Sequence, residues 1–217
     1  MTKKVAVILS GCGFLDGAEI RESVLTLLSL DSLDIEYDIF APNKVQHHTV
    51  NHLSSEEQGE SRNIMVEAAR IARGNITALD ELNPDNYDAL VIPGGFGVAK
   101  NLCTFAFDGV NATVDETVKT VITSTHAAKK PIVAICIAPA LVALTIKGCE
   151  LTIGSCIDTA AALESLGAKH KITTSAEFVV DDTNKVITTA AYMHDTAKLD
   201  EIHKGIFGAL EAMKSLI

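Results

Sequence analysis

Residues 131–139, PIVAICIAP, hold the pattern that decides the fold. A run of strand-forming residues follows the proline and leads without a break into Cys136, and an apolar helix candidate, residues 137–146, begins directly after it. A strand that turns this tightly into a helix requires small side chains two positions before and after the turn residue, as Ala134 and Ala138 provide. The pattern indicates a nucleophile elbow, in which the amino end of the helix favours a thiolate on Cys136. A buried structural cysteine is the alternative that the spacing alone leaves open.

The rest of the chain alternates strand patterns with helix patterns. Apolar or alternating runs predict strands at residues 5–9, 35–40, 87–92, 132–135 and 151–153. Apolar residues at helical spacing predict helices at residues 19–30, 62–73, 114–129, 137–146, 159–166 and 195–216. In the first of these helices, the residues at that spacing are Ile20, Val24, Leu27 and Leu28. Residues 178–180 and 186–189 flank a turn sequence and predict a hairpin. This order predicts one domain over residues 1–217, an α/β fold with a mostly parallel sheet covered by helices on both faces.

The loops that follow the strands are the candidate site, because ligands of open α/β sheets bind at the carboxyl ends of the strands. Residues 10–19, SGCGFLDGAE, follow the first strand and bring Glu19 to that edge. Residues 93–97, PGGFG, follow a middle strand, and their backbone N–H groups can hold an oxyanion. A helix-capping carboxylate and a plain turn are the simpler interpretations of these two features. The glycine spacing after the first strand does not match a dinucleotide-binding fingerprint.

The composition argues against several classes of function. The formal net charge of −10 is unfavourable for nucleic-acid binding. No apolar run reaches the ~18 residues of a membrane helix. The apolar run at residues 5–9 is shorter than the ~7–15 residues of a signal peptide, although residues 9–12, LSGC, mimic a lipoprotein cleavage site. Five cysteines without CxxC spacing indicate free thiols, and we therefore expect a cytoplasmic protein.

Several sequence blocks spread along the chain resemble one family. The blocks are VILSGCGFLDGAEI, SRNIMVEAARIARG, DALVIPGGFGVAKNL, ICIAPA, LTIGSCIDTA and TTAAYM. Together they resemble the ThiJ/PfpI superfamily, and within it the enhancing-lycopene-biosynthesis (ElbB-like) branch, over nearly the whole chain. The resemblance implies a flavodoxin-like three-layer sandwich of the class I glutamine amidotransferase type. It makes Cys136 the reactive cysteine and Glu19 its partner carboxylate, and it places the backbone amides of Gly95 and Ile137 around an oxyanion site.

At two positions the sequence lacks a motif found in other members of the superfamily, which narrows the range of activities expected for this chain. Ile137 stands where protease-like members carry a histidine, and residues 188–195 lack the His-x-Glu of amidotransferases. The resemblance then supports a glyoxalase III-like hydro-lyase that converts glyoxal or methylglyoxal into a 2-hydroxy acid without a metal or other cofactor. In this mechanism Cys136 forms a hemithioacetal, and Glu19 moves the protons. We expect burial and the nearby sulfur to raise the pKa of Glu19, so that it is protonated around neutral pH.

Two alternatives belong to other functional classes. In the first, Cys136 senses oxidants in a regulatory protein that affects isoprenoid metabolism. In the second, the protein hydrolyses an amide, with His194 and Asp195 as base and orienting group in the first turn of the last helix.

Other residues have more local predictions. Asn101 and Tyr192 are expected to line the substrate site, and Cys12 is expected to be a spectator thiol. His47, His48 and His52 are not expected to bind a metal, because no carboxylate or cysteine is spaced to complete a site.

The expected assembly is a two-fold homodimer that binds a small dicarbonyl substrate and neither nucleic acid nor a membrane. The superfamily contains many homodimers, and the 47% hydrophobic content suggests apolar surface buried between subunits. Residues 44–59, predicted as a polar loop or small hairpin, and residues 96–111 are the candidate contacts.

Overall fold

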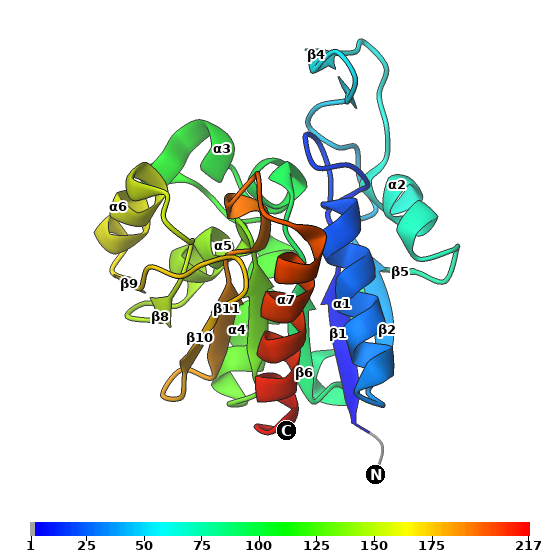
Figure 1. The fold of residues 1–217 in the computed structure, drawn as a ribbon. Coiled ribbons are helices and arrows are strands. Elements are labelled where there is room, and N and C mark those ends of the chain that lie inside the picture. The colour runs from blue at the N-terminus through cyan, green and yellow to red at the C-terminus, as the bar shows by residue number, and fades with distance from the viewer. Residues whose placement is uncertain (1–2) are drawn as a thin grey trace.

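The computed structural model describes residues 3–217, and its centre is a sheet with the strand order β10-β11-β7-β6-β1-β2-β5 (Figure 1). The strands are β1 (Lys4–Ile8), β2 (Glu36–Ala41), β5 (Thr77–Ala78), β6 (Ala89–Ile92), β7 (Ile132–Ile135), β10 (Phe178–Asp181) and β11 (Val186–Thr189). Neighbouring strands run parallel except for β10 and β11, which form an antiparallel hairpin. The mostly parallel sheet and the hairpin are both confirmed.

Helices cover both faces of this sheet, and each face has its own apolar core. One face carries α1 (Ile20–Ser32), α2 (Ile64–Ile71) and α7 (Leu199–Lys214), and the other carries α4 (Glu116–Ala127), α5 (Ala138–Thr145) and α6 (Ile157–Ser165). Strand β1 separates the two cores, because Val5 and Val7 belong to the first and Ala6 and Ile8 to the second. The result is the predicted three-layer sandwich.

The buried face of α1 differs from the sequence prediction. Ile20, Val24 and Leu28 are each about half exposed. The residues of α1 that are buried are mostly polar: Glu22, Ser23, Thr26, Ser29 and Leu30. The hydroxyl groups of Ser23 and Ser29 each donate to a backbone carbonyl one turn earlier, which satisfies them inside the packed layer. Apolar spacing therefore identified the helix but not the direction in which it faces.

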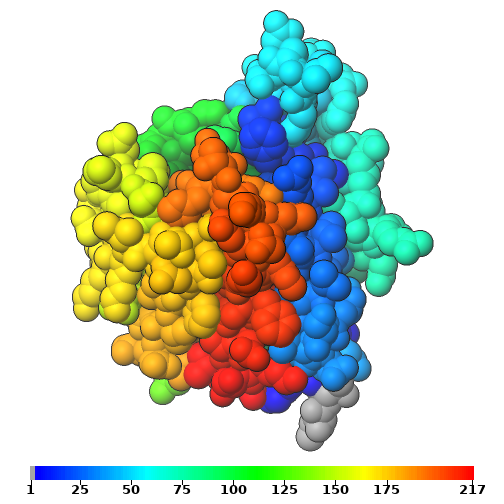
Figure 2. Space-filling model, viewed as in Figure 1, coloured from blue at the N-terminus to red at the C-terminus, as the bar shows by residue number. Residues whose placement is uncertain are grey.

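Several small elements lie outside the main sheet. A hairpin of β3 (Val50–Asn51) and β4 (Glu56–Glu57) projects from the body of the molecule, as Figures 1 and 2 show. A second small sheet pairs β8 (Glu150–Leu151) with β9 (Lys169–His170). A π-helical turn (Val98–Leu102) and the short helix α3 (Phe105–Asp108) follow β6, and neither was predicted. Short 3₁₀ turns occur at Leu79–Glu81, Pro84–Asn86, Gly109–Asn111 and Ala191–Met193. None of the helices in the described part of the chain is long and apolar enough to cross a membrane.

The loops after β1 and β6 lie against each other at the carboxyl edge of the sheet. The Glu19 N–H donates to the carbonyl oxygen of Gly94 at 2.9 Å, and the Phe96 N–H donates to that of Phe14 at 2.8 Å. Gly95 has a φ of +101°, and a Cβ atom there would lie 2.4 Å from the backbone nitrogen of Glu19. Only glycine permits this approach, which brings both loops beside the end of β7.

Candidate active site

Cys136 occupies the tight turn between β7 and α5. Its φ is +60°, in the left-handed region that non-glycine residues rarely adopt, and its N–H donates to the carbonyl oxygen of Thr189 at 2.9 Å. Ala134 and Ala138, the small residues on either side, are fully buried. Strained backbone of this kind is typical of functional turns. The predicted geometry of a nucleophile elbow is confirmed, and the reactivity of Cys136 stays a prediction.

The carboxyl group nearest to the sulfur belongs to Glu22, whereas the sequence had suggested Glu19. Glu22 lies in the first turn of α1, is fully buried, and approaches the side chain of Cys136: a Cβ atom built on Gly94 would lie 2.4 Å from the Cys136 Cβ and 2.6 Å from a Glu22 oxygen. Its two oxygens accept the N–H groups of Gly94 at 3.0 Å and Tyr192 at 3.1 Å. Burial, followed by the charge of Glu19, raises the pKa of Glu22 to about 8. Glu22 is therefore mostly protonated at neutral pH.

Glu19 has a different position, at the wall of the cavity above Cys136. It is the N-cap of α1, and its carboxylate accepts the N–H of Glu22 at 2.6 Å. Burial raises the pKa of Glu19, while backbone hydrogen bonds and Arg21 oppose the rise. The expected direction of the shift is confirmed, but the sulfur is not among its causes. The prediction that Glu19 directly partners the thiol is corrected, because the helix turns Glu22 rather than Glu19 toward Cys136.

Two backbone amides point at the sulfur. The N–H groups of Gly95 and Ile137 lie close enough to the Cys136 side chain to lower the pKa of its thiol. Burial and the Glu22 carboxylate act in the opposite direction, and the net effect raises the pKa of the thiol. The expectation that Cys136 favours a thiolate is therefore corrected, because burial outweighs the neighbouring N–H groups. The two amides predicted to form an oxyanion site thus meet at Cys136, and their catalytic role stays a prediction.

A cavity of about 510 Å³ opens above the sulfur. It is lined by Phe14, Glu19, Gly95, Phe96, Ala99, Phe105, Ala106, Cys136, Ile137, Thr159, Tyr192, Met193 and Asp195. Tyr192 is therefore where the sequence predicted it. Asn101 does not line the cavity, because its amide nitrogen donates to the carbonyl oxygens of Ser10 at 2.9 Å and Asp16 at 3.0 Å. Its amide oxygen accepts the N–H of His47 at 2.9 Å, so Asn101 braces the loop after β1 instead.

The histidines lie away from the sulfur. No histidine of residues 3–217 is among the lining residues of the cavity. His194 follows a 3₁₀ turn instead of starting the last helix, and its Nε2 pairs with the carbonyl oxygen of Thr173 at 2.9 Å. The proposed base for amide hydrolysis is therefore not placed beside Cys136. Cys12 is a free thiol outside the cavity lining.

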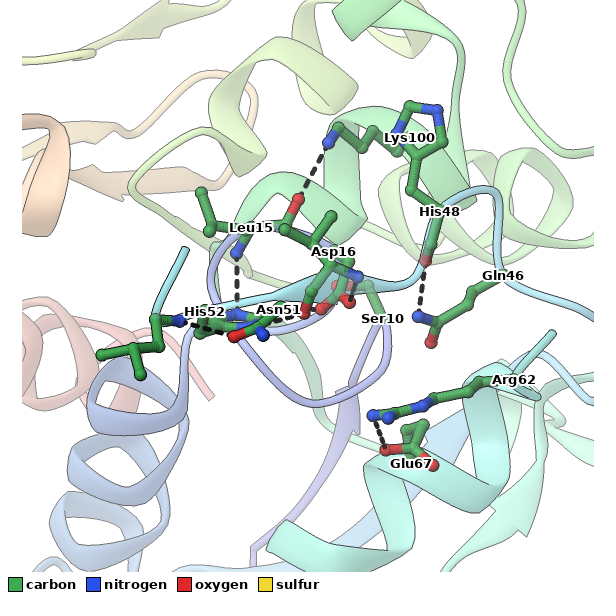
Figure 3. Close-up of polar contacts among 12 residues, drawn as sticks. Ser10, Leu15, Asp16, Gln46, His48, Asn51, His52, Arg62, Glu67 and Lys100 are labelled. Carbon is green, nitrogen blue, oxygen red and sulfur yellow. Dashed lines mark hydrogen bonds and ion pairs between the residues drawn. The ribbon is translucent and has the colours of Figure 1, made fainter. Parts of the chain in front are cut away.

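No metal site is evident in the described chain. The residues that the structure describes contain no cluster of three or more histidine, cysteine, aspartate or glutamate side chains arranged to hold a metal ion. His52 instead accepts the Leu15 N–H through Nε2 at 3.2 Å (Figure 3).

The sandwich and the strand–cysteine–helix turn define a class I glutamine amidotransferase-like α/β protein with a cysteine at the carboxyl edge of its sheet. Residues 14–200 match the DJ-1/PfpI family, and the chain belongs to this family.

Similar proteins support the assignment. The chain is 47% identical to the rat "ES1 protein homolog, mitochondrial", covering 94% of this chain and 80% of that protein. It is 46% identical to the human "Glutamine amidotransferase-like class 1 domain-containing protein 3, mitochondrial", covering 94% of this chain and 79% of that one. The crystal structure of an isoprenoid biosynthesis protein with an amidotransferase-like domain from Ehrlichia chaffeensis superposes with a TM-score of 0.93, at 38% identity over 99% of both chains. Glyoxalase III from Candida albicans, at 14% identity over 97% of both chains and a TM-score of 0.62, shares the fold.

Proposed function

We propose that this chain is a cofactor-independent, glyoxalase III-like hydro-lyase that converts glyoxal or methylglyoxal into a 2-hydroxy acid. The proposal rests on one observation: two carboxyl groups lie near Cys136, one beside its sulfur and one in the wall of the cavity above it. Glu22 contacts the sulfur, and Glu19 faces the cavity in which a substrate would lie. This arrangement suits a reaction that adds a thiol to an aldehyde and then moves protons between neighbouring atoms.

The first step is the addition of Cys136 to the aldehyde. A bond forms between the sulfur and the aldehyde carbon, and the thiol proton passes to the aldehyde oxygen, which gives a hemithioacetal. The ionised form of Glu22, a minority at neutral pH because the pKa is about 8, takes this proton from the thiol and passes it to the aldehyde oxygen. The N–H groups of Gly95 and Ile137 stabilise the negative charge that develops on sulfur and oxygen.

The second step moves a proton between the two substrate carbons. The ionised form of Glu19 removes the hydrogen of the former aldehyde carbon as a proton and returns it to the neighbouring carbonyl carbon. The hydroxyl proton of the hemithioacetal passes to the oxygen of that carbonyl group, so the first carbon becomes a thioester carbonyl and the second carries the 2-hydroxyl group. Water then hydrolyses the thioester, releasing the 2-hydroxy acid and restoring the thiol. One carbon is oxidised and its neighbour is reduced, so water is the only co-reactant.

Conversion of methylglyoxal to lactate by purified protein tests this function. Wild-type protein is expected to form lactate, and Cys136→Ser is expected to lose this activity. Unchanged lactate formation by Cys136→Ser would exclude the mechanism.

A redox-sensing role is the second candidate function. It is favoured by the hydrogen-bond donors that surround the sulfur of Cys136. An oxygen added to the Cys136 sulfur would meet the N–H groups of Gly95 and Ile137 and the carboxyl group of Glu22. Cys103 and Cys149 provide the comparison, since both are buried and neither lines the cavity. Mass spectrometry after mild peroxide treatment should find oxidation concentrated on Cys136, and equal oxidation of all three would exclude a sensor.

We further propose a homodimer that works in the cytoplasm on a small dicarbonyl substrate. The half-exposed apolar residues Ile20, Val24 and Leu28 form a stripe along α1, one residue from each successive turn. A second copy of the chain can cover this stripe, which begins at the rim of the site. All five cysteines are unpaired, as a reducing compartment requires. Fractionation of the source cells tests the location, and recovery of the protein in an organelle would contradict it. The rat and human relatives are named as mitochondrial, so the mitochondrial fraction is the one to compare.

A further inference from the structure

The cavity above Cys136 continues into a second cavity. The second has a volume of about 700 Å³ and is lined by Gly13, Phe14, Glu19, Ile20, Arg21, His52, Phe96, Tyr192 and Asp195. Five of these residues also line the first cavity: Phe14, Glu19, Phe96, Tyr192 and Asp195. The first cavity alone is in the size range of pockets that hold drug-sized ligands. Methylglyoxal, the smallest methyl-bearing α-oxoaldehyde, would occupy a small part of this combined space.

Aromatic side chains gather at the boundary between the two cavities. The chain has only seven phenylalanines and no tryptophan, and three of the phenylalanines line the first cavity together with Tyr192. Phe14 and Phe96 are shared by both cavities and remain 47% and 48% exposed. Exposed aromatic rings beside a cavity mark a surface that an apolar group can cover.

Both rings are held in place by elements outside the sheet. Leu15, next to Phe14, donates its N–H to Nε2 of His52 on the projecting hairpin (Figure 3). The His52 ring packs edge-on against Phe14, with ring centroids 5.4 Å apart. Lys100, in the π-helical turn, donates to the carbonyl oxygen of Leu15 at 2.8 Å and lies over the Phe96 ring, 5.2 Å from its centroid. The aromatic boundary is therefore a fixed part of the site.

The charges around the boundary select against an anion. Glu19 and Asp195 lie in the wall that the two cavities share. Arg21, at the outer side, already donates to the Tyr192 hydroxyl at 3.1 Å and lies over the Tyr192 ring. A neutral apolar group fits between Phe14 and Phe96 better than a carboxylate or phosphate does.

We propose that the second cavity is a subsite for an apolar flank of the carbonyl substrate, and that the preferred substrates are α-oxoaldehydes bearing an aromatic or branched aliphatic group. The proposal rests on the proposed function, since it assumes that Cys136 receives the aldehyde. The flank lies between Phe14 and Phe96 while the aldehyde carbon faces the sulfur.

The test compares phenylglyoxal with methylglyoxal by following formation of mandelate and lactate. For wild-type protein, kcat/KM is expected to be at least about tenfold higher for phenylglyoxal, because burial of extra apolar groups favours binding by this order. Phe14→Ala and Phe96→Ala should each lower this ratio about tenfold. Phe107→Ala is the matched control, because Phe107 is 45% exposed and lines neither cavity, and its ratio should not change. A carboxylate on the phenyl ring should lower kcat/KM relative to phenylglyoxal.

The outcomes separate the subsite from the proposed function. If wild-type protein converts both substrates with equal kcat/KM, or if Phe14→Ala and Phe96→Ala keep the wild-type ratio, the subsite is wrong and the function stands. If wild-type protein converts neither, the function is wrong, and the subsite is tested by binding of acetophenone to the Cys136→Ser protein in ligand-observed NMR. Binding that weakens about tenfold on adding Phe96→Ala then supports the subsite, and absence of binding overturns it.

Discussion

The buried carboxyl group of Glu22, in the first turn of α1, lies beside the thiol of Cys136, at the turn from β7 into α5, and raises the pKa of that thiol. The contact joins the first helix of the chain to the end of β7, so the environment of the sulfur depends on how α1 packs against the sheet. The carboxyl oxygens of Glu22 also accept two backbone N–H groups, which fixes their orientation toward the sulfur.

The stability of the protein should depend on pH through Glu22. Its pKa is about 8 in the folded protein, against the ordinary value of 4.5, so the folded state binds its proton more tightly than the unfolded state does. The contribution is complete below pH 4.5 and is lost as the pH rises to about 8, by at most about 1.4 kcal/mol per pH unit. Urea unfolding of wild-type protein and Glu22→Gln at pH 5 and pH 8 measures it. Wild-type protein should lose more stability than the variant over this range, and parallel losses would contradict the raised pKa.

Gly94 should tolerate no side chain. A Cβ atom there would lie 2.4 Å from the Cβ of Cys136 and 2.6 Å from an oxygen of Glu22, so Gly94→Ala must separate the two groups. We expect a loss of about 2–3 kcal/mol in the free energy of unfolding, together with slower alkylation or turnover at Cys136. Gly59→Ala is the control, because a Cβ atom at Gly59 meets nothing within 4 Å. Equal behaviour of the two variants would show that Glu22 and Cys136 are not packed as described.

The stripe on α1 should form the dimer contact. Light scattering of wild-type protein should give twice the chain mass of 23.0 kDa, and Val24→Glu should give a single chain mass, because a charge would be buried at the contact. Val66→Glu places the same charge on an exposed valine of α2 and should remain dimeric. A wild-type mass near 23.0 kDa would exclude the dimer, and a dimeric Val24→Glu would place the contact elsewhere.

Asn101 should matter for stability through the loop after β1. Asn101→Ala removes three hydrogen bonds, two of them buried, and leaves the carbonyl oxygens of Ser10 and Asp16 without this donor. We expect a loss of about 2–4 kcal/mol in the free energy of unfolding. A Tm equal to that of wild-type protein in calorimetry would show that the bracing is not needed.

The sequence predicted those parts of the fold and site that depend on neighbours along the chain. The elbow at Cys136 could be predicted because its steric requirement involves only residues two positions away. The strands and most helices followed from short apolar runs, and some of their ends shifted. The last helix, predicted from residue 195, begins at Leu199.

The missed features depend on contacts between distant segments. Glu22 was overlooked because the exposed stripe of Ile20, Val24 and Leu28 resembles a buried face. The sequence did contain a sign of the buried face: the polar residues Glu22, Thr26 and Ser29 recur at helical spacing on the opposite side of α1. The position of Asn101 depends on backbone groups contributed by residues 10, 16 and 47, which no local pattern brings together.

Separate substitutions of the two carboxyl groups distinguish their proposed roles. Glu19→Gln should lower kcat for lactate formation by about a hundredfold while leaving the rate of Cys136 alkylation near that of wild-type protein, because Glu19 acts on the substrate carbons. Glu22→Gln should change both quantities, because Glu22 contacts the sulfur. Equal effects of the two variants on the rate of Cys136 alkylation would contradict the separate roles of Glu19 and Glu22.

The central claim is that Cys136 carries the chemistry, and the most direct measurement is lactate formation from methylglyoxal by wild-type and Cys136→Ser protein, with Cys103→Ser as the control. Cys103 is buried away from the cavity lining, so its substitution tests the effect of losing a thiol elsewhere. The account predicts steady turnover by wild-type and Cys103→Ser protein and a loss of at least about a hundredfold in Cys136→Ser. Turnover by Cys136→Ser at the wild-type rate would contradict it.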